Sequence, residues 1–341
     1  MRFFFNKGVK MKQCKALLWP FWVMFFMGCA SLDGEPEVPK ITESLTTKEA
    51  LLFGFEWGGD TFVEAKNLVK KRQDFETASG VAEAVLLSDL EPSAYMWRAM
   101  QVYQGINKKF VSPKLIRQLI SSNNEFVRRM GWQLSAIRPS DLVKVVLEKH
   151  LTDAVISGAE AKVLLPEMAA AVKANGLADS YSLLREGLFE KGGVEFVSAM
   201  IEFNANRALE DFIVYLARAT VEDLRQKNQT TIDLPTSLAI LKFLNEKKVP
   251  VGHPNLAHLY LYAVSRNIAL ADLAMGALEK SMADNRSYFA FSLAKLPVWI
   301  QVAFVENSRE HLDSNLGLFL AELKDVTTHA EVIEEINGIR L

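Results

Sequence analysis

Ser292 and Lys295 have the spacing that comes nearest to a known catalytic arrangement. In a Ser-x-x-Lys pair the lysine can activate the serine hydroxyl, and enzymes of this kind also need a downstream Lys-Thr-Gly strand. No Lys-Thr-Gly occurs in the chain. Gly187 and Gly192 have the spacing of a phosphate-binding loop, but Gly193-Val194 follows where lysine and a hydroxyl residue are required. We therefore interpret the first pair as a chance match and the glycines as a helix end and turn.

The other polar residues give no stronger signal for catalysis or metal binding. The five histidines are spread along the chain: His150, His253, His258, His311 and His329. The second and third of these are five residues apart, so they do not share a helix face as an i, i+4 zinc pair would. Glu210-Asp211 and Glu334-Glu335 could act as acid and base only inside a cleft, and such pairs on helices are usually solvated. We expect a protein that is not an enzyme, with no metal site and no cofactor.

Cys29 is the one residue for which the sequence indicates a chemical modification. Five basic residues and no acidic residue precede or flank the start of an apolar run from Ala16 to Met27, and Gly28 stands directly before the cysteine. This pattern is typical of an export signal, and the run is too short to span a bilayer. Gly28 and Cys29 resemble the lipobox of bacterial lipoproteins, although Phe26 and Met27 depart from its usual leucine and small residue.

The lipoprotein resemblance implies diacylglyceryl attachment to the Cys29 sulfur, cleavage that removes residues 1–28, and acylation of the new amino group. Several acyl chains make a stable membrane anchor. Ala30 and Ser31, in place of an aspartate after the cysteine, favour the outer membrane, with the body facing the periplasm. Two alternatives stay open: Cys29 could be a chance cysteine in an uncleaved signal anchor, and Met11 could be the true start.

The charge balance bears on the partner. Removal of residues 1–28 would leave 34 basic and 41 acidic residues, a net charge of −7. Nucleic-acid binding needs basic surfaces, so we expect no nucleic-acid partner. Residues 29–45 are polar and contain prolines, and we predict a lipidated cysteine followed by a flexible tether there. One basic cluster at helical spacing is interpreted as a solvated helix face: Lys66, Lys70, Lys71 and Arg72.

The apolar residues after position 46 recur at i, i+3, i+4 and i+7, which predicts amphipathic helices. Clean period-2 alternation is absent, so we predict an all-α domain over residues 46–341. Ser112-Pro113 and Asn123-Asn124 are typical of helix starts, and Asn175-Gly176 is typical of a helix end. Further first helices of helix pairs are predicted near residues 141, 177, 207, 235 and 268, with end helices over 46–57 and 325–341 and a long loop over 225–233.

Residues 112–137 form the clearest repeat unit. Two helices are predicted, and their buried positions are Leu115, Ile116, Leu119 and Ile120 in the first and Phe126, Val127, Met130, Leu134 and Ile137 in the second. The unit resembles a HEAT repeat, because Val127-Arg128 and Gly131 match the Val-Arg pair and small residue of that repeat's second helix. The resemblance implies an α-solenoid, in which neighbouring helix pairs bury each other's faces.

Aromatic residues recur along the predicted array, mostly at spacings that suit a core. Trp132 lies between the predicted buried positions of its helix, and with Arg128 it forms our candidate binding surface. Solenoids hold partners on such surfaces, and aromatic residues are favoured anchors. We expect a membrane-anchored scaffold or accessory factor that binds another envelope protein. The alternative is an envelope enzyme acting on peptidoglycan or another polymer, and a carrier of a small ligand or lipid is a third possibility.

Overall fold

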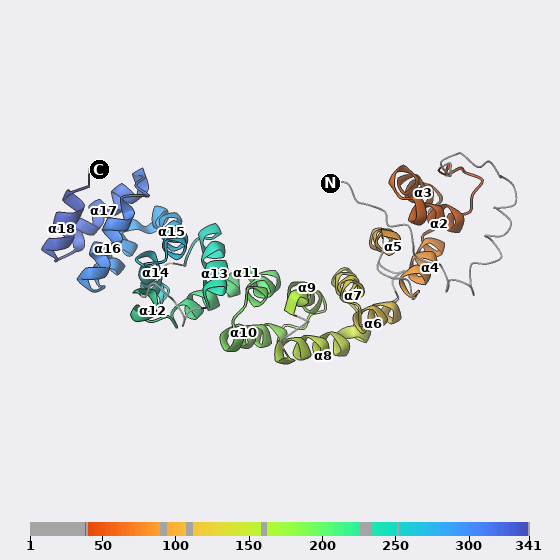
Figure 1. The fold of residues 1–341 in the computed structure, drawn as a ribbon, viewed down its shortest axis with the longest axis horizontal. Helices are drawn as coiled ribbons and strands as arrows, with labels where there is room; N and C mark the ends of the chain where they lie inside the picture. Colours follow the sequence, from red (N-terminus) through yellow and green to blue (C-terminus); the bar gives the residue numbers. More distant parts are fainter. Residues whose placement is uncertain are drawn as a thin grey trace, which may run out of the picture. The chain divides into compact units, whose positions relative to one another are not determined.

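The computed structural model describes residues 38, 40–88, 94–106, 112–157, 162–225, 233–250 and 252–339. Over these residues the backbone forms seventeen α-helices and one 3₁₀ helix, and no strand. The predicted all-α class is confirmed, and the helices stack as an α-solenoid (Figure 1). Cys29, the predicted signal over residues 1–28 and most of the predicted tether lie outside the described residues. No described helix is both long enough and apolar enough to cross a membrane.

The chain divides into two compact units, Met1–Arg72 and Gln73–Leu341. The first contains α2 (Thr47–Trp57) and α3 (Gly59–Arg72), which pack against each other. A capping box starts α2: the Glu49 amide donates to Thr46 Oγ1 at 3.2 Å, and the Thr46 amide donates to Glu49 Oε2 at 2.9 Å. These reciprocal bonds satisfy two amides that a helix start otherwise leaves unpaired. The prediction of a single domain over residues 46–341 stays a prediction.

The second unit contains the other helices. In chain order they are α4 (Phe75–Leu86), α5 (Ala94–Gly105), α6 (Pro113–Ile120), α7 (Glu125–Ile137), α8 (Asp141–Ser157), α9 (Leu165–Ala174), α10 (Ser180–Lys191), α11 (Val194–Leu216), α12 (Val221–Arg225), α13 (Leu234–Glu246), α14 (Leu256–Ala263), α15 (Ile268–Ala294), α16 (Val298–Ser308), α17 (Ser314–Val326) and α18 (Ala330–Asn337). The 3₁₀ helix η2 (Lys162–Leu164) leads into α9.

The helices of the second unit lie in two rows (Figure 1). One row is formed by α5, α7, α9, α11, α13, α15 and α17, each packed on the next. In the other row α6, α8 and α10 pack in succession, as do α14, α16 and α18. Helices from opposite rows also pair, as α6 does with α7 and α14 with α15. The core therefore runs between the rows, because each helix buries one apolar stripe against several neighbours.

Two long helices change direction at an asparagine. The backbone leaves the helical region at Asn204 in α11 (φ −158°, ψ 92°) and at Asn285 in α15 (φ −147°, ψ 49°). Asn204 Oδ1 accepts from the Arg207 amide at 3.2 Å, so the asparagine starts the second half as an N-cap would. The helix start predicted near residue 207 corresponds to this second half. The starts predicted near 235 and 268 correspond to α13 and α15. Both lie in the row of α7, the second helix of its pair, so their prediction as first helices was wrong.

Asn175 joins neighbouring pairs from inside the core. It ends α9, and Gly176 follows at φ +73°, so the predicted helix end is confirmed. Its side-chain Nδ2 donates to the carbonyls of Ser135 (3.0 Å) and Ala171 (2.8 Å), and its Oδ1 accepts from the Ser140 amide at 2.8 Å. One buried amide thus satisfies backbone groups at the ends of both α7 and α9, which would otherwise lack partners away from water.

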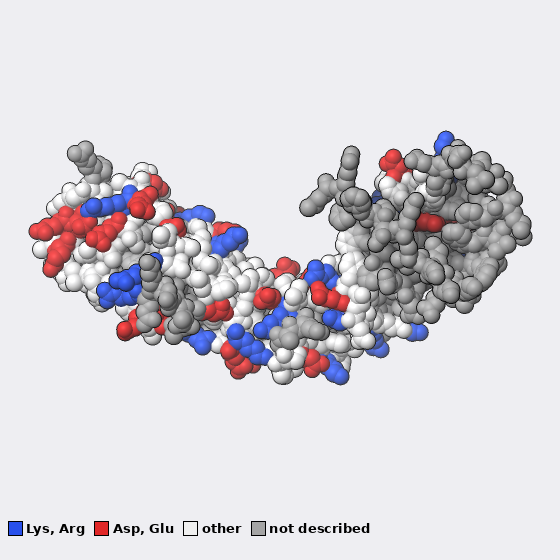
Figure 2. Space-filling view, viewed as in Figure 1, with Lys and Arg blue, Asp and Glu red and all other residues white. Residues whose placement is uncertain are grey.

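The surface of the second unit is charged unevenly (Figure 2). Along the middle of the unit, basic and acidic side chains alternate on the visible face. Acidic side chains gather over α17 and α18. In the first unit the predicted basic cluster is largely solvated, since Lys70, Lys71 and Arg72 are exposed and Lys71 pairs with exposed Glu43.

Candidate interaction surface

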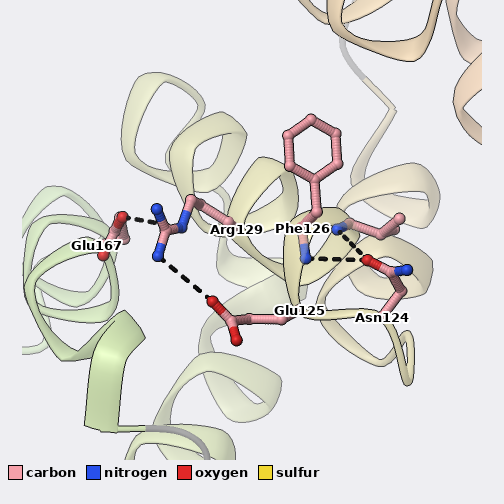
Figure 3. Close-up of polar contacts among 6 residues, drawn as sticks. Asn124, Glu125, Phe126, Arg129 and Glu167 are labelled. Carbon is pink, nitrogen blue, oxygen red and sulfur yellow. Dashed lines mark hydrogen bonds and ion pairs between the residues drawn. The ribbon is translucent and has the colours of Figure 1, made fainter. Parts of the chain in front are cut away.

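The α6–α7 pair carries the site predicted from the sequence, and N-caps fix where its two helices begin. Ser112 Oγ accepts from the Leu115 amide at 3.4 Å, and Pro113 stands at the first helical position of α6. Asn124 Oδ1 accepts from the amides of Phe126 (3.0 Å) and Val127 (3.3 Å) at the start of α7 (Figure 3). Both predicted helix starts are confirmed. The four predicted core residues of α6 are buried: Leu115, Ile116, Leu119 and Ile120.

Gly131 explains how closely the two helices approach. A Cβ atom at this position would lie 2.8 Å from the backbone nitrogen of Ile120 and 2.9 Å from the Leu119 Cβ. Backbone atoms cannot move aside as a flexible side chain can, so any larger residue would push α6 and α7 apart. The small residue singled out in the sequence is therefore a packing residue.

The structure corrects the prediction for Trp132. Its side chain is fully buried, and its ring meets the His150 ring of α8 edge-on at 6.3 Å between centroids. The indole Nε1 is buried without a hydrogen-bond partner among the described residues. Trp132 therefore belongs to the core and not to a binding surface. Burial also lowers the pKa of His150.

Arg128 closes the turn between α6 and α7. Its Nη1 donates to the carbonyls of Ser122 and Asn123, both at 3.0 Å. These contacts satisfy carbonyls that follow the end of α6, as a basic side chain near a helix C-terminus often does. The side chain is half-buried, so its role in binding a partner stays a prediction.

An exposed aromatic pair lies beside the predicted site. Trp97 of α5 is 41% exposed, and its ring is 6.2 Å from that of half-buried Phe126 in α7. Figure 3 shows the Phe126 side chain turned away from Glu125 and Arg129, which point toward α9. Sequence periodicity placed Phe126 in the core, and it also placed Ile137 there, which is 36% exposed. The signal for this surface was Trp97, one of the recurring aromatic residues.

Charged residues of α7 join this helix to the neighbouring repeat. Arg129 Nη2 lies 3.5 Å from Glu125 Oε1 within α7, and Arg129 Nε lies 3.3 Å from Glu167 Oε1 of α9 (Figure 3). One guanidinium thus spans two carboxylates on neighbouring helices of a row. The pairs are partly exposed, so their contribution is geometric more than energetic.

The Ser-x-x-Lys residues are not arranged as a nucleophile and its base. The Ser292 hydroxyl donates to the Tyr288 carbonyl at 2.8 Å, one turn earlier in α15. The Lys295 ammonium lies 4.0 Å from the centre of the Phe291 ring. Both groups therefore have structural contacts inside or beside their own helix. Gly192 ends α10 at φ +64°, which confirms the predicted helix end.

The acidic pairs do not converge into an acid–base site. Asp211 accepts from the Tyr181 hydroxyl at 2.8 Å and from Arg185 Nε at 2.6 Å, whereas its neighbour Glu210 is exposed. Burial, followed by the Asp211 carboxylate, raises the pKa of the Tyr181 phenol far above its usual value. This cluster holds α10 against α11. Glu335 pairs with Arg309, and Glu334 is exposed.

The histidines also lie apart. His253 Nδ1 accepts from the Asn255 amide at 3.1 Å just before α14, and His311 Nε2 lies 3.4 Å from Asp272 Oδ1. Burial lowers the pKa of both His253 and His258. Within the described ranges no group of three or more His, Cys, Asp or Glu side chains is placed to hold a metal ion.

One polar cleft of about 280 Å³ opens where α10 and α11 end and α13 begins. Tyr215, Arg218 and Tyr262 line it, together with Asp233. The Arg218 guanidinium donates to the Phe189 carbonyl, and Asp233 caps α13 by accepting from Thr236. The cleft is small for a ligand site, and these two charged groups already hold the repeats together.

Comparison with known proteins adds no assignment to these surfaces: no protein-family model, curated protein or solved structure matches this chain.

Proposed function

We propose that this chain is a membrane-anchored lipoprotein that serves as a protein-interaction scaffold or accessory factor of an envelope machine. The proposal combines two features. The first is the lipobox-like Gly28-Cys29 after a basic and apolar leader. The second is the α-solenoid fold, which presents a long row of helices on which partners can bind.

The interaction part of the proposal is supported by the contacts of the described polar groups. The serine, lysine and paired carboxylates that could do chemistry are bonded within or between neighbouring helices, or are exposed singly. Aromatic and charged surface remains available on successive helices, including the Trp97–Phe126 pair. Surfaces of this type favour binding over catalysis.

The anchor part is tested by metabolic labelling with an alkyne-tagged fatty acid, comparing the native protein with Cys29→Ala. We expect label and membrane association only with the native cysteine, since the acyl chains supply the membrane affinity. Label retained by Cys29→Ala, or membrane association unaffected by it, would contradict the anchor. Sucrose-gradient separation of the two membranes then tests the expected outer-membrane location.

The scaffold part is tested by crosslinking in cells followed by affinity capture. We expect a near-stoichiometric envelope protein with the native chain and reduced recovery with Cys29→Ala, because the anchor raises the local concentration of both partners. Absence of any partner above background, at normal membrane localisation, would argue against a scaffold.

A further inference from the structure

Negative charge is concentrated in the last three helices of the second unit. Residues 73–297 contain 25 acidic and 25 basic residues, so that stretch is neutral. Residues 298–339, which form α16–α18, contain eight acidic residues and two basic ones, a net charge of −6. The acidic side chains over α17 and α18 in Figure 2 are part of this excess. The asymmetry falls on one end of the stack of helix pairs.

Most of these acids are not used to hold the helices together. Glu335 is paired with Arg309, and Glu322 is paired with Arg286 of α15. Asp313 caps α17. The remaining five acids are exposed and form no ion pair with a described residue: Glu306, Glu310, Asp325, Glu331 and Glu334. Unpaired like charges on adjacent helices repel one another, so they weaken this end of the unit unless a cation or a basic group lies nearby.

The same end exposes apolar side chains. α17 is the last helix of its row and packs on α15 and α18. Its outer stripe contains Leu318, which is 51% exposed, Ala321 and Asp325. Val326 and Leu312, at the two ends of α17, are 41% and 37% exposed. The helix that carries exposed Asp325 thus also exposes aliphatic side chains to solvent.

We infer that this acidic end face, defined by Leu318 and Asp325 of α17 and Glu334 of α18, docks a basic segment of a partner protein. The inference rests on the proposed scaffold function and assigns a face and a partner chemistry to it. Lysine and arginine side chains of the partner neutralise the exposed carboxylates, and an aliphatic residue of the partner covers Leu318. Anionic lipid, nucleic acid and the same face of a second copy are all repelled by this surface, which leaves a basic polypeptide as the occupant.

The test places a photoreactive phenylalanine analogue in the full-length protein in its native cells, in place of Leu318 or, separately, in place of Val145. Val145 is the control on α8, within the neutral stretch, and at 76% exposure it is more accessible than Leu318. Crosslinked peptides are identified by mass spectrometry. Each position is also examined in the charge reversals Asp325→Lys with Glu334→Lys and, as a matched control, Glu148→Lys with Glu186→Lys, all four being exposed carboxylates.

We expect an adduct at position 318 to one envelope protein, through a peptide of net positive charge. The reversal at the end face should lower its yield roughly tenfold, because rim charges control association, whereas the control reversal should leave it unchanged. A protein adduct at position 145 alone would overturn this inference and leave the scaffold function standing. An adduct at 318 to lipid, to a second copy or to an acidic peptide would also overturn it. No protein adduct at either position would also overturn this inference, and the capture experiment described above would then decide the scaffold function.

Discussion

The α6–α9 pairs and the α16–α18 end of the second unit share one architecture and differ in how they use their surface groups. In α6–α9, Arg129 contacts carboxylates on two helices, Arg128 closes a turn, and Trp132 is fully buried. In α16–α18, six acids are exposed, of which only Asp313 caps a helix, and Leu318 lies open on the outer side of α17. The α6–α9 helices use these side chains to pack against their neighbours. The α16–α18 helices retain exposed groups that can bind another molecule.

Trp132→Ala should give the largest change in stability, and it tests whether Trp132 belongs to the core of the α6–α9 region. We expect a loss of about 3–5 kcal/mol in the free energy of unfolding, because a fully buried indole leaves a cavity. Trp97→Ala, at a 41% exposed position, should cost less than about 1 kcal/mol. Denaturant unfolding followed by circular dichroism measures both. Similar losses at the two tryptophans would contradict the assignment of Trp132 to the core.

Gly131→Ala should destabilise the α6–α7 pair by about 1–3 kcal/mol, since the added methyl would meet the backbone of Ile120. Gly80→Ala is the matched control at an exposed position of α4, where nothing lies within 4 Å of the new Cβ. There we expect a gain of about 0.5–1 kcal/mol from helix propensity alone. The two glycines should therefore change the unfolding midpoint in opposite directions, and a common direction would refute the close-packing argument.

Removal of a helix N-cap should lower the free energy of unfolding by the same amount in both regions. Equal losses would show that the two regions differ in surface charge and not in the stability of their helices. Asn124 caps α7, and Asp313 Oδ1 caps α17 by accepting from the Leu316 amide at 2.7 Å. Asn124→Ala and Asp313→Ala should each cost about 1 kcal/mol of unfolding free energy. Asp313→Asn keeps the capping oxygen and should lose little. A full loss with Asn would mean that the charge, and not the cap, matters.

The smallest effect concerns Glu279 of α15, which lies near the acidic end. Its Oε1 is buried without a hydrogen-bond partner among the described residues, and burial raises its pKa above 4.5, with His311 opposing and Asp313 adding to the shift. An acid whose pKa rises on folding contributes stability below its unfolded pKa and loses it as the pH rises through the folded pKa.

Glu279→Gln should therefore raise the melting temperature at pH 7 by about 1–2 °C, because it removes a poorly solvated charge. The advantage should disappear below pH 4.5, where the carboxyl is protonated in both states. Glu148→Gln, at an exposed site on α8, should show no such pH dependence. A gain that is constant with pH would remove the electrostatic explanation.

Local sequence signals predicted local structure well in this chain. Ser112, Asn124 and Gly176 mark helix boundaries through capping and backbone preferences that involve only neighbouring residues. Apolar period also located the core of α6. It failed at Phe126, Val127 and Ile137, whose exposure depends on which helix covers that side of α7 and not on their spacing. Lipidation of Cys29 and the identity of a partner stay predictions.

The sequence by itself determined the all-helical class and the stacked-pair architecture, because helix period and caps are properties of short segments. Only the tertiary structure decided which polar groups are free. Trp132 and Trp97 are chemically alike, yet the first is fully buried and the second is 41% exposed. Likewise, Glu167 meets Arg129 of a neighbouring helix, whereas exposed Glu331 and Glu334 form no ion pair with a described residue. Those outcomes depend on contacts between residues tens of positions apart, which a pattern along the chain does not specify.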